Sequence, residues 1–126
     1  MTDGTGIVLL TFKLFAADPA IGEEIMIKHV VMWKLKETAM GATKYENALA
    51  MKKRLEGLQE KIPELQSAEV GINIKVSPTA SDVVLISTFS SEEALETYMN
   101  HPEHKRVADF VSSVRLERSV VDYIVK

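Results

Sequence analysis

Two side chains suited to proton transfer, Tyr98 and His104, lie six residues apart in the segment Tyr98-Met99-Asn100-His101-Pro102-Glu103-His104. A neutral imidazole beside a phenol can act as a general base, because the unperturbed pKa of histidine lies near working pH. Pro102 interrupts the helical pattern between them, so a helix that ends and restarts there would direct both side chains toward one pocket. The alternative is structural. His104 would then bond a buried carbonyl, and Tyr98 would pack with its hydroxyl satisfied.

His29 is a further candidate for a catalytic or positioning role. The alternation of residues 27–36 predicts a strand, and His29 shares one of its faces with Val31 and Trp33. A lone histidine on an apolar face is more often a hydrogen-bonded structural residue than a catalyst. Both interpretations stay open from the sequence.

Composition excludes several kinds of site. The chain has no cysteine, which rules out disulfides, thiolate metal ligands and cysteine nucleophiles. It has three histidines, and pairing His29 and His104 with Glu103 or Asp122 would lack the close spacing typical of a metal site. We therefore predict neither a metal nor a cofactor.

Charge and hydropathy bear on partners and location. The net charge of −3 gives no broad electrostatic case for nucleic acid or for an anionic membrane. The run Ile7-Val8-Leu9-Leu10 is far shorter than the ~20 residues of a membrane span. The first residues also lack the positive charge of a signal peptide. We expect a cytoplasmic protein that binds neither nucleic acid nor membrane.

The 126 residues predict one folded domain that begins near Met26, where regular alternation starts. Residues 1–25 form an N-terminal extension with a candidate strand at 7–15 and a helical turn beginning at Asp18-Pro19. Met26 is also a candidate for the natural first residue. The extension is either a dispensable tail or an arm that grasps a partner.

Residues 26–126 alternate between the patterns of strands and helices. We expect strands at 27–36, 68–76, 83–89 and 119–125, and helices from Thr43 to Pro63, from a Ser90–Glu93 capping box to Asn100, and at 103–114. This order is typical of an α+β, ferredoxin-like βαββαβ fold. Right-handed crossovers would place the helices on one face of a four-stranded antiparallel sheet.

The sheet face without helices is expected to be apolar and to form the ligand pocket. The residues assigned to that face, besides His29, are Val31, Trp33, Leu35, Val83, Leu85 and Phe89. Such a surface is larger than a monomer normally exposes, and a two-fold homodimer would cover it. The same face would enclose a small apolar ligand.

Three segments in order resemble the stress-responsive A/B barrel (Dabb) family of the dimeric α+β barrel superfamily. They are Lys28-His29-Val30-Val31-Met32-Trp33-Lys34-Leu35-Lys36, the Tyr98–His104 segment, and Val121-Asp122-Tyr123. The resemblance covers residues 26–126. It implies a homodimer with a barrel-like interior, and most family members have no established activity.

The resemblance also bears on the candidate residues. A plant polyketide cyclase of this family closes its substrate by an aldol condensation, and residues matching Tyr98 and His104 do this work. A histidine also matches His29. A further pocket histidine of that enzyme is replaced here by Val83, which argues against polyketide cyclisation itself.

Three functions follow as hypotheses. The first is a homodimeric module that binds a small apolar ligand without robust catalysis. The second is a cofactor-free, cyclase-like lyase in which His104 is the general base, Tyr98 the donor to a carbonyl and His29 a positioning group. The third is a cofactor-free monooxygenase of the same superfamily, with Trp33 near the substrate.

Overall fold

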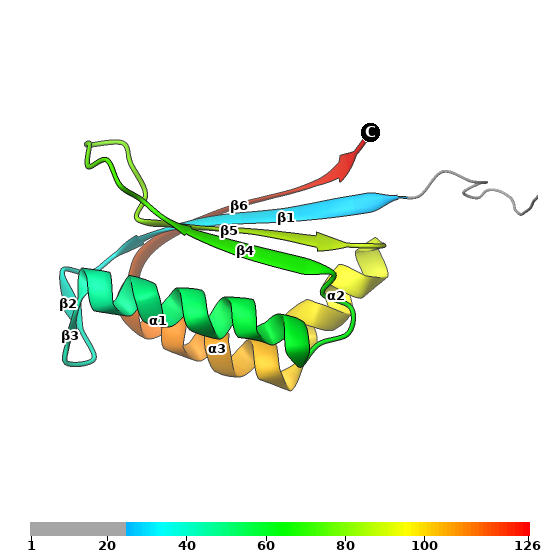
Figure 1. Ribbon diagram of the computed structural model, residues 1–126, viewed down its shortest axis with the longest axis horizontal. Helices are drawn as coiled ribbons and strands as arrows, with labels where there is room; N and C mark the ends of the chain where they lie inside the picture. The colour runs from blue at the N-terminus through cyan, green and yellow to red at the C-terminus, as the bar shows by residue number, and fades with distance from the viewer. Residues whose placement is uncertain (1–24) are drawn as a thin grey trace, which may run out of the picture.

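An antiparallel sheet with helices against one face makes up the structure, a computed structural model that describes residues 25–126 (Figure 1). The strand order is β4-β5-β1-β6. The strands are β1 (Met26–Leu35), β4 (Ser67–Ile72), β5 (Val83–Phe89) and β6 (Arg115–Val125). The helices are α1 (Lys44–Gly57), α2 (Glu92–Asn100) and α3 (Pro102–Val114), with a 3-10 turn at Leu58–Glu60. The expected ferredoxin-like fold is confirmed.

The two expectations for the N-terminal extension, a strand at 7–15 and a helical turn at 18–19, lie outside the described residues. Within residues 25–126, no helix is both long enough and apolar enough to cross a lipid bilayer.

A small hairpin precedes α1 and was not expected from the sequence. Its strands are β2 (Thr38–Ala39) and β3 (Ala42–Thr43), and Met40 and Gly41 between them have φ values of 54° and 74°. Two consecutive positive φ angles are typical of the tight turns that join short antiparallel strands. Thr43 then begins α1 through a reciprocal capping box with Glu46. The hairpin therefore fixes where α1 starts.

Two helix boundaries differ from expectation. Ser91, rather than Ser90, caps α2, because its side chain accepts a hydrogen bond from the Ala94 backbone N–H at 3.0 Å. The helix α1 ends at Gly57, well before Pro63, and tightens into the 3-10 turn. The capping-box pattern with Glu93 had favoured Ser90, but Ser90 follows directly on the end of β5, and the helix begins one residue later.

The second predicted strand was too long. β4 ends at Ile72, and the alternating Ile74 and Val76 lie in a loop where they are 99% and 95% exposed. Ile72 pairs with Val83, the first residue of β5, so the chain beyond Ile72 has no strand to pair with. β6, in contrast, begins four positions before the expected Ser119 and pairs along the full length of β1.

The faces of β1 and β5 are reversed relative to expectation. The set assigned to the open face, Val31, Trp33, Leu35, Val83, Leu85 and Phe89 together with His29, is buried in the core beneath the helices. Alternation sorts strand residues into two sets, but does not say which set meets the helices. The other set on β1, Val30 and Met32, is flanked by Lys28 and Lys34. These two lysines were the feature of the sequence that indicated which set faces away from the helices.

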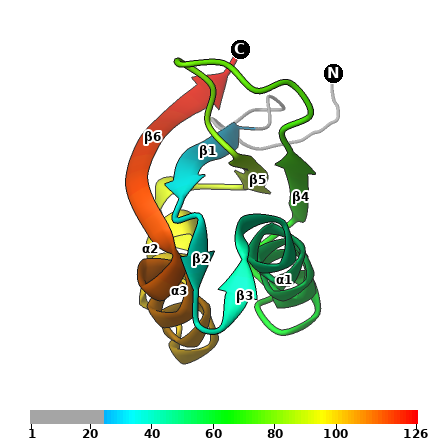
Figure 2. The same cartoon turned by 90° about the vertical axis from the view of Figure 1, so that its left-hand side faces the viewer.

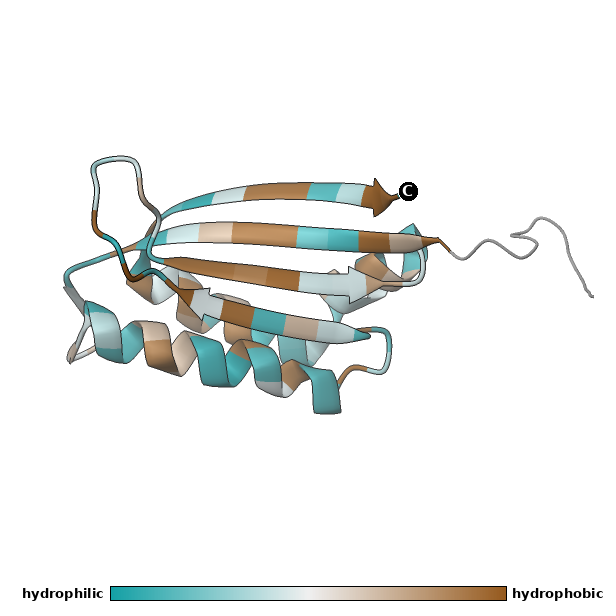
Figure 3. Cartoon of the chain, turned by 45° about the horizontal axis from the view of Figure 1, so that its top comes forward, coloured by the Kyte–Doolittle hydropathy of each residue, from teal (hydrophilic) through white to brown (hydrophobic). Residues whose placement is uncertain are grey.

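The sheet face away from the helices is still partly apolar. Register places Val30, Met32, Val84, Ile86, Val121 and Tyr123 on it, and we call these six residues the open face. Met32 and Val121 are 44% and 54% exposed. Figures 2 and 3 show the helices packed under one side of the sheet and apolar stretches along β6, β1 and β5. An apolar sheet face away from the helices is therefore present as expected, but different residues form it. This face remains the physical reason for expecting an interface.

Candidate functional site

Four aromatic rings meet between the sheet and the helices. The rings of Tyr98 and His104 have centroids 4.5 Å apart, and Tyr98 lies 6.3 Å from His29 and 5.0 Å from Phe89. Tyr98, Phe89 and His29 are almost completely buried. The structure thus brings together all three candidate catalytic residues, but on the helix-covered side of the sheet.

The segment between α2 and α3 positions His104. His101 ends α2 and also caps α3, because its Nδ1 accepts a hydrogen bond from the Glu103 backbone N–H at 3.0 Å. Pro102 occupies the first turn of α3, where its lack of an N–H costs nothing. His104 follows in that first turn and faces Tyr98. Within this motif His101 and Pro102 shape the start of α3, and His104 is the residue that reaches the ring of Tyr98.

Asp122 is a member of the cluster that the sequence interpretation did not assign to the site. Its Oδ1 lies 2.5 Å from Nδ1 of His29, and register pairs the two residues across β1 and β6. This contact favours the tautomer with the proton on Nδ1, which leaves Nε2 free to accept a proton. Alternation along the last strand puts Asp122 on one of its two faces. Only the register between β6 and β1 shows that this face also carries His29.

Burial controls the protonation states of the other two groups. Burial lowers the pKa of His104, and the nearby His29 lowers it further, while the backbone carbonyl of Met99 acts in the opposite direction. Burial raises the pKa of the Tyr98 phenol. Near neutral pH, His104 is therefore an uncharged imidazole and Tyr98 an uncharged hydrogen-bond donor. That combination suits proton abstraction beside a carbonyl.

A cavity of about 350 Å³ opens beside the cluster. His29 and His104 line it, together with Val31, Trp33 and Leu85 of the predicted pocket. The remaining wall comes from the helices and β6, namely Leu55, Met99, Ala108, Val111, Ser112, Arg115 and Arg118. Its volume lies at the lower end of the range for small-molecule sites.

Three predicted pocket residues lie elsewhere. Val83 and Phe89 are buried in the core, and Phe89 supports the rings of His29 and Tyr98. Leu35 lines a second cavity of about 350 Å³, formed with residues from β1, α1 and the loop that follows β4. Tyr98 is so fully enclosed that it reaches the first cavity only through its neighbours.

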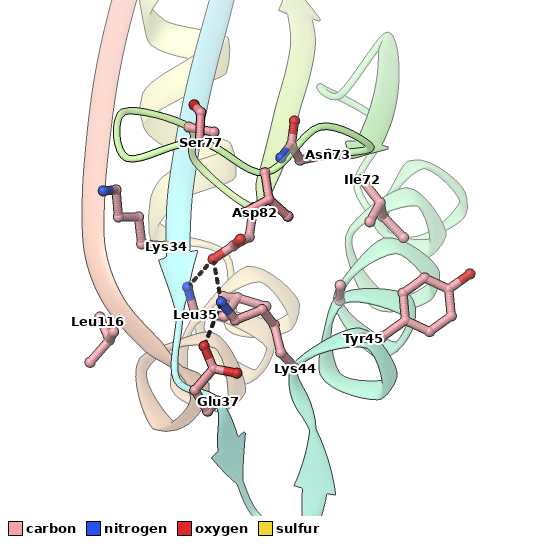
Figure 4. A pocket seen from close by; sticks show the side chains of 13 residues that line it. Lys34, Leu35, Glu37, Lys44, Tyr45, Ile72, Asn73, Ser77, Asp82 and Leu116 are labelled. Carbon is pink, nitrogen blue, oxygen red and sulfur yellow. Dashed lines mark hydrogen bonds and ion pairs between the residues drawn. The ribbon is translucent and has the colours of Figure 1, made fainter.

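The second cavity is built around Asp82 (Figure 4). Its carboxylate accepts the Leu35 backbone N–H at 2.8 Å and lies 3.6 Å from the ammonium of Lys44, which also pairs with Glu37 at 3.2 Å. The hydrogen bond to Glu37 raises the pKa of Lys44. The charged groups of Asp82, Lys44 and Glu37 are thus occupied by partners within the chain, and they link β1 to the start of α1.

Within residues 25–126, no group of three or more histidine, aspartate or glutamate side chains is placed to hold a metal ion.

The sequence profile of the stress-responsive A/B barrel domain matches residues 27–125. The chain belongs to this family. The match includes the site described above, and confirms the resemblance carried by the three segments. No curated protein matches the sequence at a significant level.

Solved structures similar to this family member share its fold. A dimeric ferredoxin-like protein of unknown function from Bacteroides fragilis is 28% identical, covering 79% of this chain and 96% of its own, with a TM-score of 0.67. A dimeric ferredoxin-like protein from Thermobifida fusca is 18% identical, covering 82% and 93%, with a TM-score of 0.70. A hydroxynitrile lyase from Passiflora edulis is 16% identical, covering 80% and 94%, with a TM-score of 0.68. The last two show similarity of fold alone.

Proposed function

We propose that the protein is a homodimer that binds a small, mainly apolar molecule in the cavity between its sheet and helices. The observation that carries this proposal is the cavity itself, which opens between the sheet and the helices beside His29 and His104. Concave sites with apolar walls and a few polar side chains are typical of small-molecule binding. The lining of this cavity fits that description, since Val31, Trp33 and Leu85 surround the two histidines.

Ligand binding can be followed through Trp33, the one tryptophan of the chain, which lines the cavity. An uncharged apolar probe such as 1-octanol should change Trp33 fluorescence saturably. Ala108→Leu, which places a larger side chain in the cavity wall, should abolish this response. Ala50→Leu, in a separate hollow between α1 and α3, should leave it intact. A response that Ala108→Leu does not weaken would contradict binding in this cavity.

The homodimer is supported by the open face and by the dimeric relatives of similar fold. Covering several half-exposed apolar side chains stabilises an interface by about 25 cal/mol per Å² removed from water. Light scattering at micromolar concentration should give twice the chain mass of 14.0 kDa. Met32→Glu should shift the protein to monomer, because a charge would be buried there. A wild-type monomer would contradict the proposal, and Tyr45→Glu, at an exposed site on α1, is the control.

Proton-transfer catalysis is a second candidate function, favoured by the short contact of Asp122 with His29 beside Tyr98 and His104. Either imidazole could take a proton from carbon next to a carbonyl, because both line the cavity, while Tyr98 packs against the two rings from inside the core. The reaction can be sought as deuterium exchange into 2-octanone, followed by NMR. Exchange should slow in His104→Gln and His29→Gln. A wild-type rate no faster than buffer would exclude this activity for simple ketones.

A further inference from the structure

The cavity has a charged end that an entirely apolar ligand would not use. Arg115 and Arg118 line it, and no aspartate or glutamate does. Register explains their position, because Arg118 pairs with Trp33 and Arg115 with Leu35, so both face the helix-covered side. In a chain with a net charge of −3, two guanidinium groups at one cavity are a local excess of positive charge.

Neither arginine is occupied by an acidic partner within residues 25–126, where none of the ion pairs involves Arg115 or Arg118. Arg118 is exposed, and Arg115, the first residue of β6, is half-buried. The positive charge of Arg118 also acts on a group that lines the cavity, since it contributes to lowering the pKa of His104. A guanidinium with its donors free is suited to binding a planar oxyanion.

A second observation points to an acceptor-bearing ligand. The indole Nε1 of Trp33 and Nδ1 of His104 are both buried, and neither has a hydrogen-bond partner among the described residues. Trp33 is only 5% exposed, and its indole N–H can only donate. A buried donor without a partner is costly, and Trp33 lies in the lining of the cavity, next to where a ligand would bind.

Much of the remaining lining is aliphatic. Val31 and Leu85 come from the sheet, and Leu55 and Val111 from the helices. The cavity therefore combines hydrocarbon surface with two guanidinium groups. We propose that its ligand is an apolar carboxylate, whose hydrocarbon part packs against the aliphatic lining and whose carboxylate is bound by Arg115 and Arg118. This inference rests on the proposed ligand-binding function, and names the chemical class of ligand.

Octanoate and octanamide test the inference, because they match in length and differ in charge. Titration of each into the wild-type dimer is followed by Trp33 fluorescence at 20 mM and 300 mM NaCl. Octanoate should bind at least about tenfold more tightly than octanamide at low salt, and only octanoate should weaken at high salt. The double variant Arg115→Gln/Arg118→Gln should reduce octanoate binding to the level of octanamide, while octanamide binding stays unchanged.

Two further variants guard against misfolding and general charge effects. Arg118→Lys retains the charge and should retain part of the preference for octanoate. Arg106→Gln removes an exposed arginine of α3 that pairs with Glu103, and should change nothing. Equal, salt-independent binding of octanoate and octanamide would overturn the carboxylate assignment and leave ligand binding standing. No response to either compound, nor to 1-octanol, would overturn both proposals.

Discussion

The Asp122 carboxylate and the His29 imidazole lie 2.5 Å apart, although 93 positions separate them in the chain. The pairing of β6 with β1 makes this contact, and His29 is only 3% exposed while the Asp122 side chain remains 44% exposed. A buried imidazole is thus held by a carboxylate that water can reach. This geometry leads to the first prediction.

Asp122→Ala should lower the free energy of unfolding by about 1 kcal/mol, near the lower end of the cost of leaving a buried polar group unpaired, because Asp122 is partly solvated. Asp122→Asn keeps an acceptor oxygen and should cost less. Urea unfolding at pH 7.5 measures both. An asparagine variant as unstable as the alanine variant would show that charge, rather than the hydrogen bond, holds His29.

His104 should make stability depend on pH. Its pKa is lowered in the folded state, so below pH 6.5 the unfolded chain binds a proton more readily than the folded protein. This contribution to stability is complete above pH 6.5 and is lost as the pH falls toward the folded-state pKa, by at most about 1.4 kcal/mol per pH unit. Urea unfolding of wild type and His104→Gln at pH 7.5 and 5.5 isolates it. An identical loss in both proteins would assign the pH dependence to other groups.

Val83 and Val84 give a matched test of the two sheet faces. Val83 is 2% exposed under the helices, whereas Val84 lies on the open face. Val83→Ala should cost about 2 kcal/mol, from two lost methyl groups and the cavity they leave. Val84→Ala should cost less in dilute protein and should weaken the dimer instead. Chemical unfolding and light scattering measure the two effects, and the reverse order would contradict the assignment of the faces.

The cap of α2 can be tested at two neighbouring serines. Ser91→Ala removes the acceptor of the Ala94 N–H and should cost about 1 kcal/mol. Ser90→Ala should change stability by less than about 0.5 kcal/mol, as is usual for surface substitutions. Thermal unfolding with a fitted enthalpy distinguishes them. Equal costs would mean that the helix start is shared between both residues.

The fold could be read from the sequence because its signals are local. The density of β-branched residues in 83–89 and the caps and prolines of the helices all act within a few positions. The second strand was overextended because Ile74 and Val76 continue the alternation of β4, while the limit on that strand is set by β5, its partner. The length of a paired strand depends on two segments, so the alternation of one segment cannot predict where the pairing ends.

The sequence grouped Tyr98, His104 and His29 as candidates, and their rings do lie close together in the structure. They lie on the helix-covered face of the sheet, whereas the sequence interpretation had assigned His29 to the open face. Asp122 and the arginines of β6 depend on the register between the first and last strands, which alternation within each strand leaves undetermined. The apolar open face made the choice harder, since both sides of β1 are apolar at its centre.

Because neighbours along β1 face opposite ways, Val30 lies on the open face and Val31 lies on the helix-covered face, where it lines the first cavity. Deletion of a single residue at this point would exchange the two surfaces for the rest of the strand, moving Trp33 outward and Met32 inward. The strand therefore tolerates substitution on either side far better than any change of length. If both proposals hold, substitutions on one side of β1 would alter the dimer and those on the other side would alter ligand binding, provided that the spacing within β1 is kept.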